Sequence, residues 1–163
     1  MGWRRNGAVM MERGMTSEDK VLEQLTARFG TPLYWYEGEE LERNYCLLQS
    51  CIAPGMEILY AVKANPTFGI LQVFRRLGAG AEVASEGEMW LALRAGFPPA
   101  EIAYTCPGKT DAGIRAALEN GIGSIHIESL DEAARVHAIA LKMNRQAPIV
   151  LRLNPTYSSS SAA

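Results

Sequence analysis

The chain has 163 residues, enough for one domain with a sizeable core. Apolar residues make up 48% and charged residues 21%, as in an ordinary globular protein, and the net charge of −2 excludes a strongly basic surface for nucleic acid. No apolar run approaches the roughly 20 residues that a membrane-spanning helix needs.

The two ends of the chain carry no predicted fold element. Residues 1–15 contain Arg4 and Arg5 without a hydrophobic stretch behind them, which excludes a secretory signal and predicts a disordered leader. Residues 156–163 are serine-rich and are predicted to form a low-complexity tail. The three cysteines lack metal-type spacing and suit free thiols in a reducing compartment, which predicts a cytoplasmic protein without a metal site.

Two helices and a short strand are predicted in the first third of the chain. Thr16 or Ser17 caps a helix that runs to about Phe29 and ends at Gly30. A strand-like run follows at residues 33–36, and a second helical stripe spans residues 39–51.

From residue 57 onward, strand-like runs alternate with helical patterns at a spacing of roughly twenty residues. The predicted strands are 57–63, 81–84, 102–105, 124–127 and 149–153. The predicted helices are 68–77, 86–95, 111–119 and 130–143. Ser85 with Glu88, and Ser129 with Glu132, have the spacing of capping boxes at two of the helix starts.

This alternation predicts parallel strands joined by right-handed crossovers, either in a doubly wound sheet or in a barrel. The dinucleotide-binding fingerprint is missing, because Gly78-Ala79-Gly80 precedes a strand instead of following one. The short, even repeat favours a barrel. A closed barrel has eight strands, so the five predicted here form a partial (β/α)8 TIM barrel in which residues 149–153 are an unprotected edge.

Lys63 ends an apolar strand-like run, where an amine needs either a partner or a chemical role. Strand alternation places Leu59, Ala61 and Lys63 on one face, and burial on that face would favour the neutral amine. A neutral amine is the group that forms a Schiff base with an aldehyde. The alternative is a lysine that snorkels to solvent or pairs with a carboxylate.

Glu82 and Arg152 are two further charges inside apolar strands. With Lys63 they either neutralise one another in one structural network or hold a polar cofactor. Barrel enzymes place their sites at the carboxyl ends of the strands, although strand ends that meet solvent are polar in any protein. The other polar groups at such ends are Ser85, Glu88, residues 106–109, Glu128 and Asn154.

Three residues near these strand ends have simpler interpretations. His126 is predicted to be a hydrogen-bonded core histidine. Cys106 has no nearby base in the sequence and is interpreted as a small buried residue, not a nucleophile. Lys109 lies in a Gly-Lys-Thr triplet without the glycine spacing of a phosphate loop.

Several segments, in order, resemble the fold-type III pyridoxal-phosphate-dependent decarboxylases, which have an alanine-racemase-type barrel. This group acts on diaminopimelate, ornithine and arginine, and the resemblance is strongest to the diaminopimelate branch. It spans roughly residues 16–155. The segments that carry it are 60–65, with Lys63 at the Schiff-base position, 80–88, 106–110, 127–129 and 151–155.

The resemblance implies an amino acid decarboxylase that uses pyridoxal 5′-phosphate, acts on a diaminopimelate- or ornithine-like substrate and forms a homodimer. It implies Lys63 as the catalytic residue and as a cofactor-binding residue. It also implies cofactor contacts from Ala61, Glu82, Glu88 and Arg152. Glu82 stands where the family usually has aspartate, which alters the geometry at that position.

The family continues beyond the point where this sequence stops. Residues 31–37 resemble a strand that belongs to a C-terminal β domain of the family. That domain, the ring-stacking histidine, the glycine-rich phosphate loop and the ring-nitrogen carboxylate have no counterpart here. The resemblance therefore predicts a truncated chain with little or no activity. The alternatives are a non-catalytic regulatory partner of a full-length decarboxylase and a racemase-like barrel, and five strands that cannot close disfavour the latter.

Overall fold

A computed structural model of the chain describes residues 16–155. The chain divides into two compact units between Tyr36 and Glu37. The predicted leader at residues 1–15 and the predicted tail at residues 156–163 lie outside the described residues. Within residues 16–155, no helix has both the length and the apolar character that crossing a membrane requires.

The described part of the first unit consists of helix α1 (Ser17–Phe29) and an irregular segment. Thr16 and Asp19 form a reciprocal capping box, in which the Asp19 amide donates to the Thr16 hydroxyl at 3.2 Å and the Thr16 amide donates to the Asp19 carboxylate at 2.8 Å. The strand predicted at residues 33–36 is not formed. A strand requires a hydrogen-bonded neighbour, and the sheet of the described residues contains none for this segment. Its assignment to a second domain stays a prediction.

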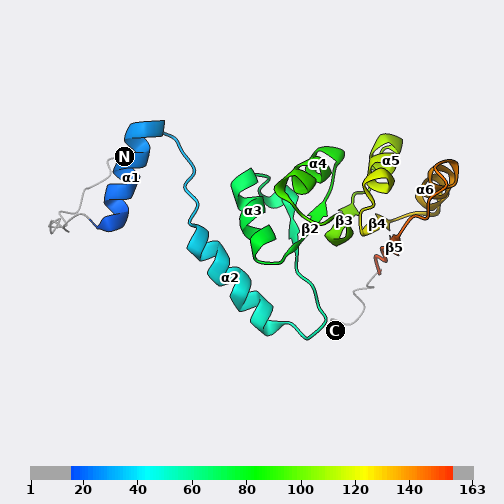
Figure 1. Cartoon of the computed structure of the whole chain (residues 1–163), viewed down its shortest axis with the longest axis horizontal. Coiled ribbons are helices and arrows are strands. Elements are labelled where there is room, and N and C mark those ends of the chain that lie inside the picture. Colours follow the sequence, from blue (N-terminus) through cyan, green and yellow to red (C-terminus); the bar gives the residue numbers. More distant parts are fainter. Residues whose placement is uncertain (1–15, 156–163) are drawn as a thin grey trace, which may run out of the picture. The chain divides into compact units, whose positions relative to one another are not determined.

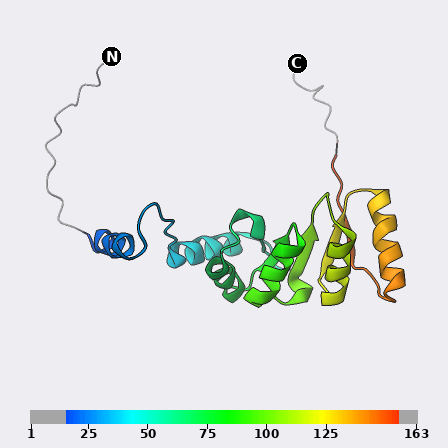
Figure 2. The ribbon, with the colours of Figure 1, turned by 90° about the horizontal axis from the view of Figure 1, so that it is seen from above.

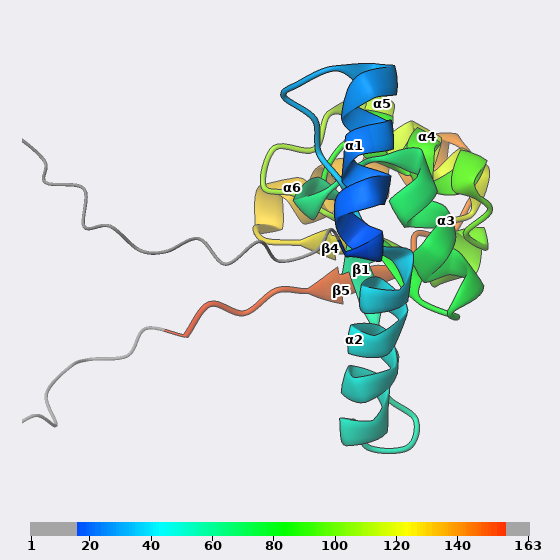
Figure 3. The same cartoon turned by 90° about the vertical axis from the view of Figure 1, so that its left-hand side faces the viewer.

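The second unit begins with helix α2 (Gly38–Cys51) and continues as a parallel sheet of five strands. Figure 3 shows α2 extending away from the strands of this unit. The strands are β1 (Leu59–Ala61), β2 (Gly80–Val83), β3 (Ile102–Thr105), β4 (Ser124–Ile127) and β5 (Ile149–Leu151). The connecting helices are α3 (Phe68–Arg76), α4 (Glu86–Ala95), α5 (Asp111–Asn120) and α6 (Leu130–Lys142), with short 3-10 turns at η1 (Val62–Ala64) and η2 (Pro99–Glu101).

The order of the strands decides between the two predicted architectures. The strands pair in chain order, β1-β2-β3-β4-β5, and every pairing is parallel. A doubly wound sheet reverses its order at a switch point, whereas this sheet advances in one direction only. Right-handed crossovers then place all connecting helices on the same side, and α3 to α6 follow one another along one side of the sheet (Figures 1 and 2). The predicted partial (β/α)8 barrel is confirmed.

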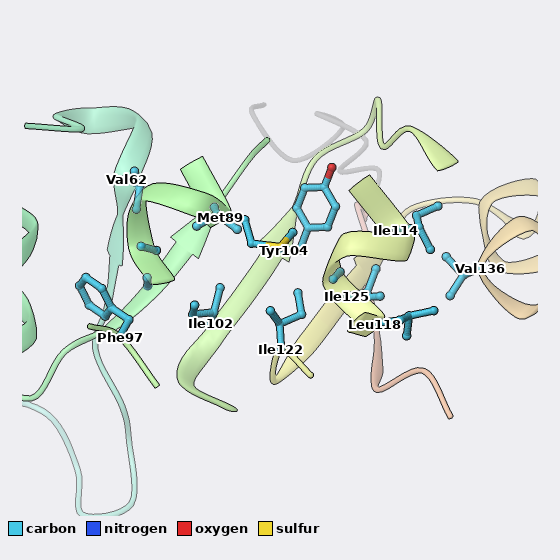
Figure 4. Packing of buried hydrophobic residues seen from close by; sticks show 14 of the residues in the cluster. Val62, Met89, Phe97, Ile102, Tyr104, Ile114, Leu118, Ile122, Ile125 and Val136 are labelled. Carbon is cyan, nitrogen blue, oxygen red and sulfur yellow. The ribbon is translucent and has the colours of Figure 1, made fainter. Parts of the chain in front are cut away.

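The core lies between the sheet and these helices. Tyr104 and Ile125 point from β3 and β4 toward the helices, where they meet Met89 of α4 and Ile114 of α5 (Figure 4), and Val83 of β2 belongs to the same buried cluster. All five side chains are at most 3% exposed. Burying a large apolar side chain contributes about 1.5–3 kcal/mol, so this layer is a main source of the fold's stability.

The strand β5 forms an edge of the sheet. It pairs with β4 alone, and Ile149 and Leu151 are 50% and 66% exposed. The unprotected edge predicted for this segment is therefore confirmed within the described residues.

Candidate functional site

The sheet face opposite α3 to α6, here called the inner face, carries a row of polar side chains. Because side chains alternate along a strand, the residues between the core positions point to this face. The strand register aligns Ala61 with Glu82, and Thr105 with His126. Glu82, Thr105 and His126 are all partly exposed, whereas the apolar residues that precede them, Ala81, Tyr104 and Ile125, are buried. The inner face is therefore the polar face of the sheet.

Lys63 does not occupy the strand position that alternation predicts. The strand β1 ends at Ala61, and Lys63 lies in the 3-10 turn η1 that follows. Its side chain is 61% exposed, so the prediction of a buried amine is wrong: the turn lifts the side chain off the sheet and into solvent. The amine nevertheless returns toward the sheet, where Nζ lies 3.4 Å from Glu82 Oε1. The alternative of a lysine paired with a carboxylate is the one that this geometry shows.

Glu82 has a second hydrogen-bond partner besides Lys63. The Thr105 hydroxyl, at the end of β3, donates a hydrogen bond to the same oxygen, Oε1, that faces Lys63. This hydrogen bond is the main cause that lowers the pKa of Glu82, with Lys63 and His126 lowering it further and burial opposing them. Glu82 is therefore an ionised carboxylate at the carboxyl end of β2.

His126 lies beside Thr105 on the inner face. Its Nε2 is 3.2 Å from the Ser124 hydroxyl, so the predicted hydrogen bond is confirmed, but the ring is partly exposed on the inner face and does not belong to the core as predicted. Burial is the main cause that lowers the pKa of His126, and the charges of Lys109 and Arg152 lower it further, while Glu82 raises it. Neighbouring charged groups thus act on the pKa of the His126 imidazole in opposite directions.

Arg152 belongs to a second ion pair, not to the one around Lys63. Its guanidinium donates to Glu128 Oε1 at 3.3 Å, and the Arg152 side chain is 53% exposed. Of the two alternatives left open for Lys63, Glu82 and Arg152, the single structural network is therefore not formed. Strands β3 and β4 separate β2 from β5, so the two pairs form independently, with His126 between them.

Glu88 has a structural role at the start of α4. Its carboxylate accepts the amide N–H of Ala84 at 2.7 Å, while its own amide donates to the Ser85 hydroxyl at 3.1 Å. The predicted capping box is shifted by one residue, because the carboxylate reaches the residue before the cap instead of the cap itself. Within residues 16–155 no hydrogen bond or ion pair joins Glu88 to Lys63. Its predicted cofactor contact stays a prediction.

At the start of α6, Glu132 caps the helix as Glu88 does in α4, and it also pairs with Lys109. The burial of this lysine was not predicted from the sequence. Glu132 accepts the Glu128 amide at 2.9 Å and pairs with Lys109 Nζ at 3.0 Å. Lys109 also donates to the carbonyl oxygens of Cys106, at 2.6 Å, and of His126, and its side chain has no exposed surface. The buried pair joins the loop after β3 to the end of β4.

Two further residues at this loop differ from the predictions. Cys106 is a partly exposed free thiol whose sulfur accepts the Gly108 amide at 3.3 Å, so it is less buried than expected. Thr105 was not predicted, because the polar residues predicted at this strand end begin at Cys106. The signal was available in the alternation of β3, where Thr105 follows buried Tyr104 and points to the opposite face. Within the described residues there is no group of three or more potential metal ligands.

The inner face fits the aldehyde end of a pyridoxal group. A partly exposed primary amine at a strand end, held by an ionised carboxylate, can reach an aldehyde that approaches from solvent. Arg152 and His126 offer hydrogen-bond donors on the same face. The donor set is thus compatible with an anionic ligand that carries an aldehyde.

Comparisons with known proteins agree with this geometry. Residues 39–163 match the family model of the pyridoxal-dependent decarboxylases, for their pyridoxal binding domain. The chain is 38% identical over 141 residues to a diaminopimelate decarboxylase of Pseudomonas aeruginosa, covering 85% of this chain and 34% of the relative. It is 36% identical over 149 residues to an L-glutamyl-[BtrI acyl-carrier protein] decarboxylase of Niallia circulans, covering 91% and 35%.

A solved structure is similar over the same region. The crystal structure of AQ1208 from Aquifex aeolicus matches with a TM-score of 0.78 and 36% identity, over 83% of this chain and 34% of that one. The chain thus spans about a third of the length of the curated relatives it matches. The chain belongs to the fold-type III family of pyridoxal-dependent decarboxylases, which includes the diaminopimelate decarboxylases.

Proposed function

We propose that this chain takes part in the pyridoxal-phosphate-dependent decarboxylation of an amino acid, with Lys63 as the residue that binds the cofactor's aldehyde. The observation that carries the proposal is the position of the Lys63 amine, at the carboxyl end of β1 and 3.4 Å from Glu82 Oε1. The family match over residues 39–163 supports the choice of cofactor.

The residues around Lys63 have distinct parts in this proposal. The carboxylate of Glu82 holds the amine at the strand end. Ala61, in register with Glu82, is a small side chain that leaves room beside the amine. Arg152 offers a guanidinium at the other side of the inner face, and Glu88 fixes the loop that follows β2. When bound, the pyridine ring takes up the electron pair that decarboxylation releases.

The substrate is proposed from the relatives. One relative is named for diaminopimelate and the other for a glutamyl group on a carrier protein, so both act on amino acid derivatives. We take a diamino acid of the diaminopimelate or ornithine type as the substrate class, acted on by a homodimer. For this chain by itself we propose weak turnover or none, because the described residues supply the amine and its carboxylate but offer no assigned phosphate site.

Reductive trapping tests the role of Lys63. The chain is incubated with pyridoxal phosphate and treated with borohydride, and its peptides are mapped by mass spectrometry. We expect the pyridoxyl label on Lys63 in preference to the other three lysines, Lys20, Lys109 and Lys142. Lys63→Arg keeps a positive charge beside Glu82 but removes the primary amine, so it should abolish this label.

Lys142→Arg is the matched control, because Lys142 is also an exposed lysine but lies in α6, far along the chain from β1. It should leave the label on Lys63 intact. Equal labelling of Lys63 and Lys142 in the wild-type chain would contradict the proposal. Release of carbon dioxide from diaminopimelate, ornithine and arginine then measures turnover, and rapid release by this chain alone would contradict the proposed weak activity.

The exposed edge strand favours one second candidate. The apolar side chains of β5 and Leu153 are exposed, and an unpaired parallel strand can pair with another chain. A non-catalytic partner of a full-length decarboxylase would use this edge. Co-purification of the chain with such an enzyme, reduced by Val150→Pro in β5, would favour this candidate, and a monomer that does not bind the enzyme would remove it.

A further inference from the structure

One carboxylate oxygen on the inner face serves two partners from two different elements. Glu82 Oε1 accepts the hydroxyl hydrogen of Thr105, from β3, and lies 3.4 Å from the amine of Lys63, from η1. The hydroxyls of Thr16 and Thr110 have local roles as helix caps. The Thr105 hydroxyl instead crosses to a neighbouring strand and bonds to a residue 23 positions away.

Threonine is suited to hold a carboxylate in place. Its branched Cβ restricts χ1, so the direction of the hydroxyl is set by the backbone of β3. The Glu82 side chain has three rotatable bonds, and the Lys63 side chain is 61% exposed on a flexible stem. The rigid member of the trio is therefore Thr105, and the position of Oε1 beside the amine depends on it.

The charges that face Glu82 act in the same direction as this hydrogen bond. Lys63 and His126 each favour the ionised carboxylate, and burial opposes them. His126 is itself next to Thr105 in the sheet register and is influenced by the charges of Lys109 and Arg152. Thr105 makes the largest contribution of all these groups to the lowered pKa of Glu82.

We propose that Thr105 is a positioning residue, which fixes the Glu82 carboxylate beside Lys63 and thereby sets the reactivity of the Lys63 amine toward an aldehyde. This inference rests on the proposed function of Lys63. It adds a residue that acts through Glu82, since the Thr105 hydroxyl donates to Glu82 Oε1. Without the hydroxyl, Glu82 Oε1 is free to rotate away, and the positive nitrogen of the Lys63 adduct loses part of its stabilisation.

The first test is a titration of the Glu82 carboxyl carbon by NMR in the full chain, with no cofactor present. Thr105→Val removes the hydroxyl and keeps the shape of the side chain, and it should raise the pKa of Glu82. Thr105→Ser restores a hydroxyl and should return the titration toward that of the wild type. Thr105→Ala is a second variant without the hydroxyl, for use if valine perturbs folding.

The second test measures labelling of Lys63 by pyridoxal phosphate and borohydride as a function of pH. At a limiting cofactor concentration, Thr105→Val should reduce the label roughly 3- to 10-fold, as expected for the loss of the net contribution of one typical hydrogen bond. The acid side of the curve of Lys63 labelling against pH should move to higher pH in Thr105→Val. Thr105→Ser should restore both the amount of label and the position of this curve. Thr110→Val loses a helix-cap hydroxyl instead and should leave the Glu82 titration and the acid side of this curve unchanged.

The two measurements separate the two proposals. If wild-type Lys63 takes no label, the proposed function fails, and the Glu82 titration still decides whether Thr105 holds the carboxylate. If Glu82 titrates identically in the wild type, Thr105→Val and Thr105→Ser, the role of Thr105 is overturned. It is also overturned if Thr105→Val and Thr110→Val reduce the label equally, since the effect would then be general destabilisation.

Discussion

The ammonium of Lys109 lies 3.0 Å from the carboxylate of Glu132, and the Lys109 side chain has no exposed surface. Lys109 comes from the loop between β3 and α5, and Glu132 comes from the first turn of α6, which follows β4. Each is also bonded to backbone, Lys109 to the carbonyl of His126 and Glu132 to the amide of Glu128. This pair therefore fixes the strand end from which His126 and Glu128 project.

Lys109→Met should lower the free energy of unfolding by about 3–5 kcal/mol, because it leaves the Glu132 carboxylate buried without its counter-charge. Lys109→Met combined with Glu132→Gln removes both charges and keeps an acceptor for the Glu128 amide. The double variant should recover a large part of the loss. Urea unfolding midpoints measure both effects, and a double variant less stable than Lys109→Met would contradict the ion-pair account.

Glu82→Gln should change how the free energy of unfolding depends on pH. The pKa of Glu82 in the folded chain is lowered from its ordinary value of 4.5, chiefly by the Thr105 hydrogen bond. Its stabilising contribution is therefore complete above pH 4.5 and disappears as the pH falls through the lowered value. At neutral pH the variant should be less stable by about 1 kcal/mol, and the difference should vanish in acid. Urea unfolding from about pH 7 to pH 3 measures this convergence; a constant difference would contradict it.

His126→Gln should remove a pH dependence of the free energy of unfolding that has the same sign as the one from Glu82. The pKa of His126 is lowered from 6.5, mainly by burial, so the unfolded chain binds a proton between the lowered value and 6.5 while the folded chain does not. Stability therefore rises with pH through this window and is complete above 6.5. Imidazole NMR titration and urea unfolding test this, and His137→Gln assigns the resonances, since the chain has two histidines. A His126 pKa above 6.5 would contradict the structure.

Gly123→Ala should destabilise the fold by about 3 kcal/mol, because an added methyl group would lie 2.0 Å from the carbonyl oxygen of Ala100. That oxygen belongs to backbone and cannot move aside as a flexible side chain would. Gly69→Ala in α3 is the control, since nothing lies within 4 Å of its added methyl group. It should raise stability by up to about 1 kcal/mol through helix propensity. Thermal unfolding compares the two, and equal effects would show that the close approach is absent.

The sequence alone determined the elements of the second unit and their order. The strands at residues 102–105 and 124–127 and the helix at residues 86–95 have the predicted limits. Serine caps and glycine stops are local signals, because a cap bonds to an amide three residues away. The even βα repeat, read without any long-range contact, was sufficient to predict a partial parallel barrel.

The tertiary structure decided how the site residues pair. Lys63 lies in a turn and not in the predicted strand, Arg152 pairs with Glu128 and not with Glu82, and Lys109 is the buried partner of Glu132. These contacts join residues 19 to 24 positions apart. They depend on strand register and on where each strand ends, and a one-residue change in either redirects a side chain. Residue types and local periodicity therefore identified Lys63 and Glu82, but only the folded sheet brought Thr105 to the oxygen between them.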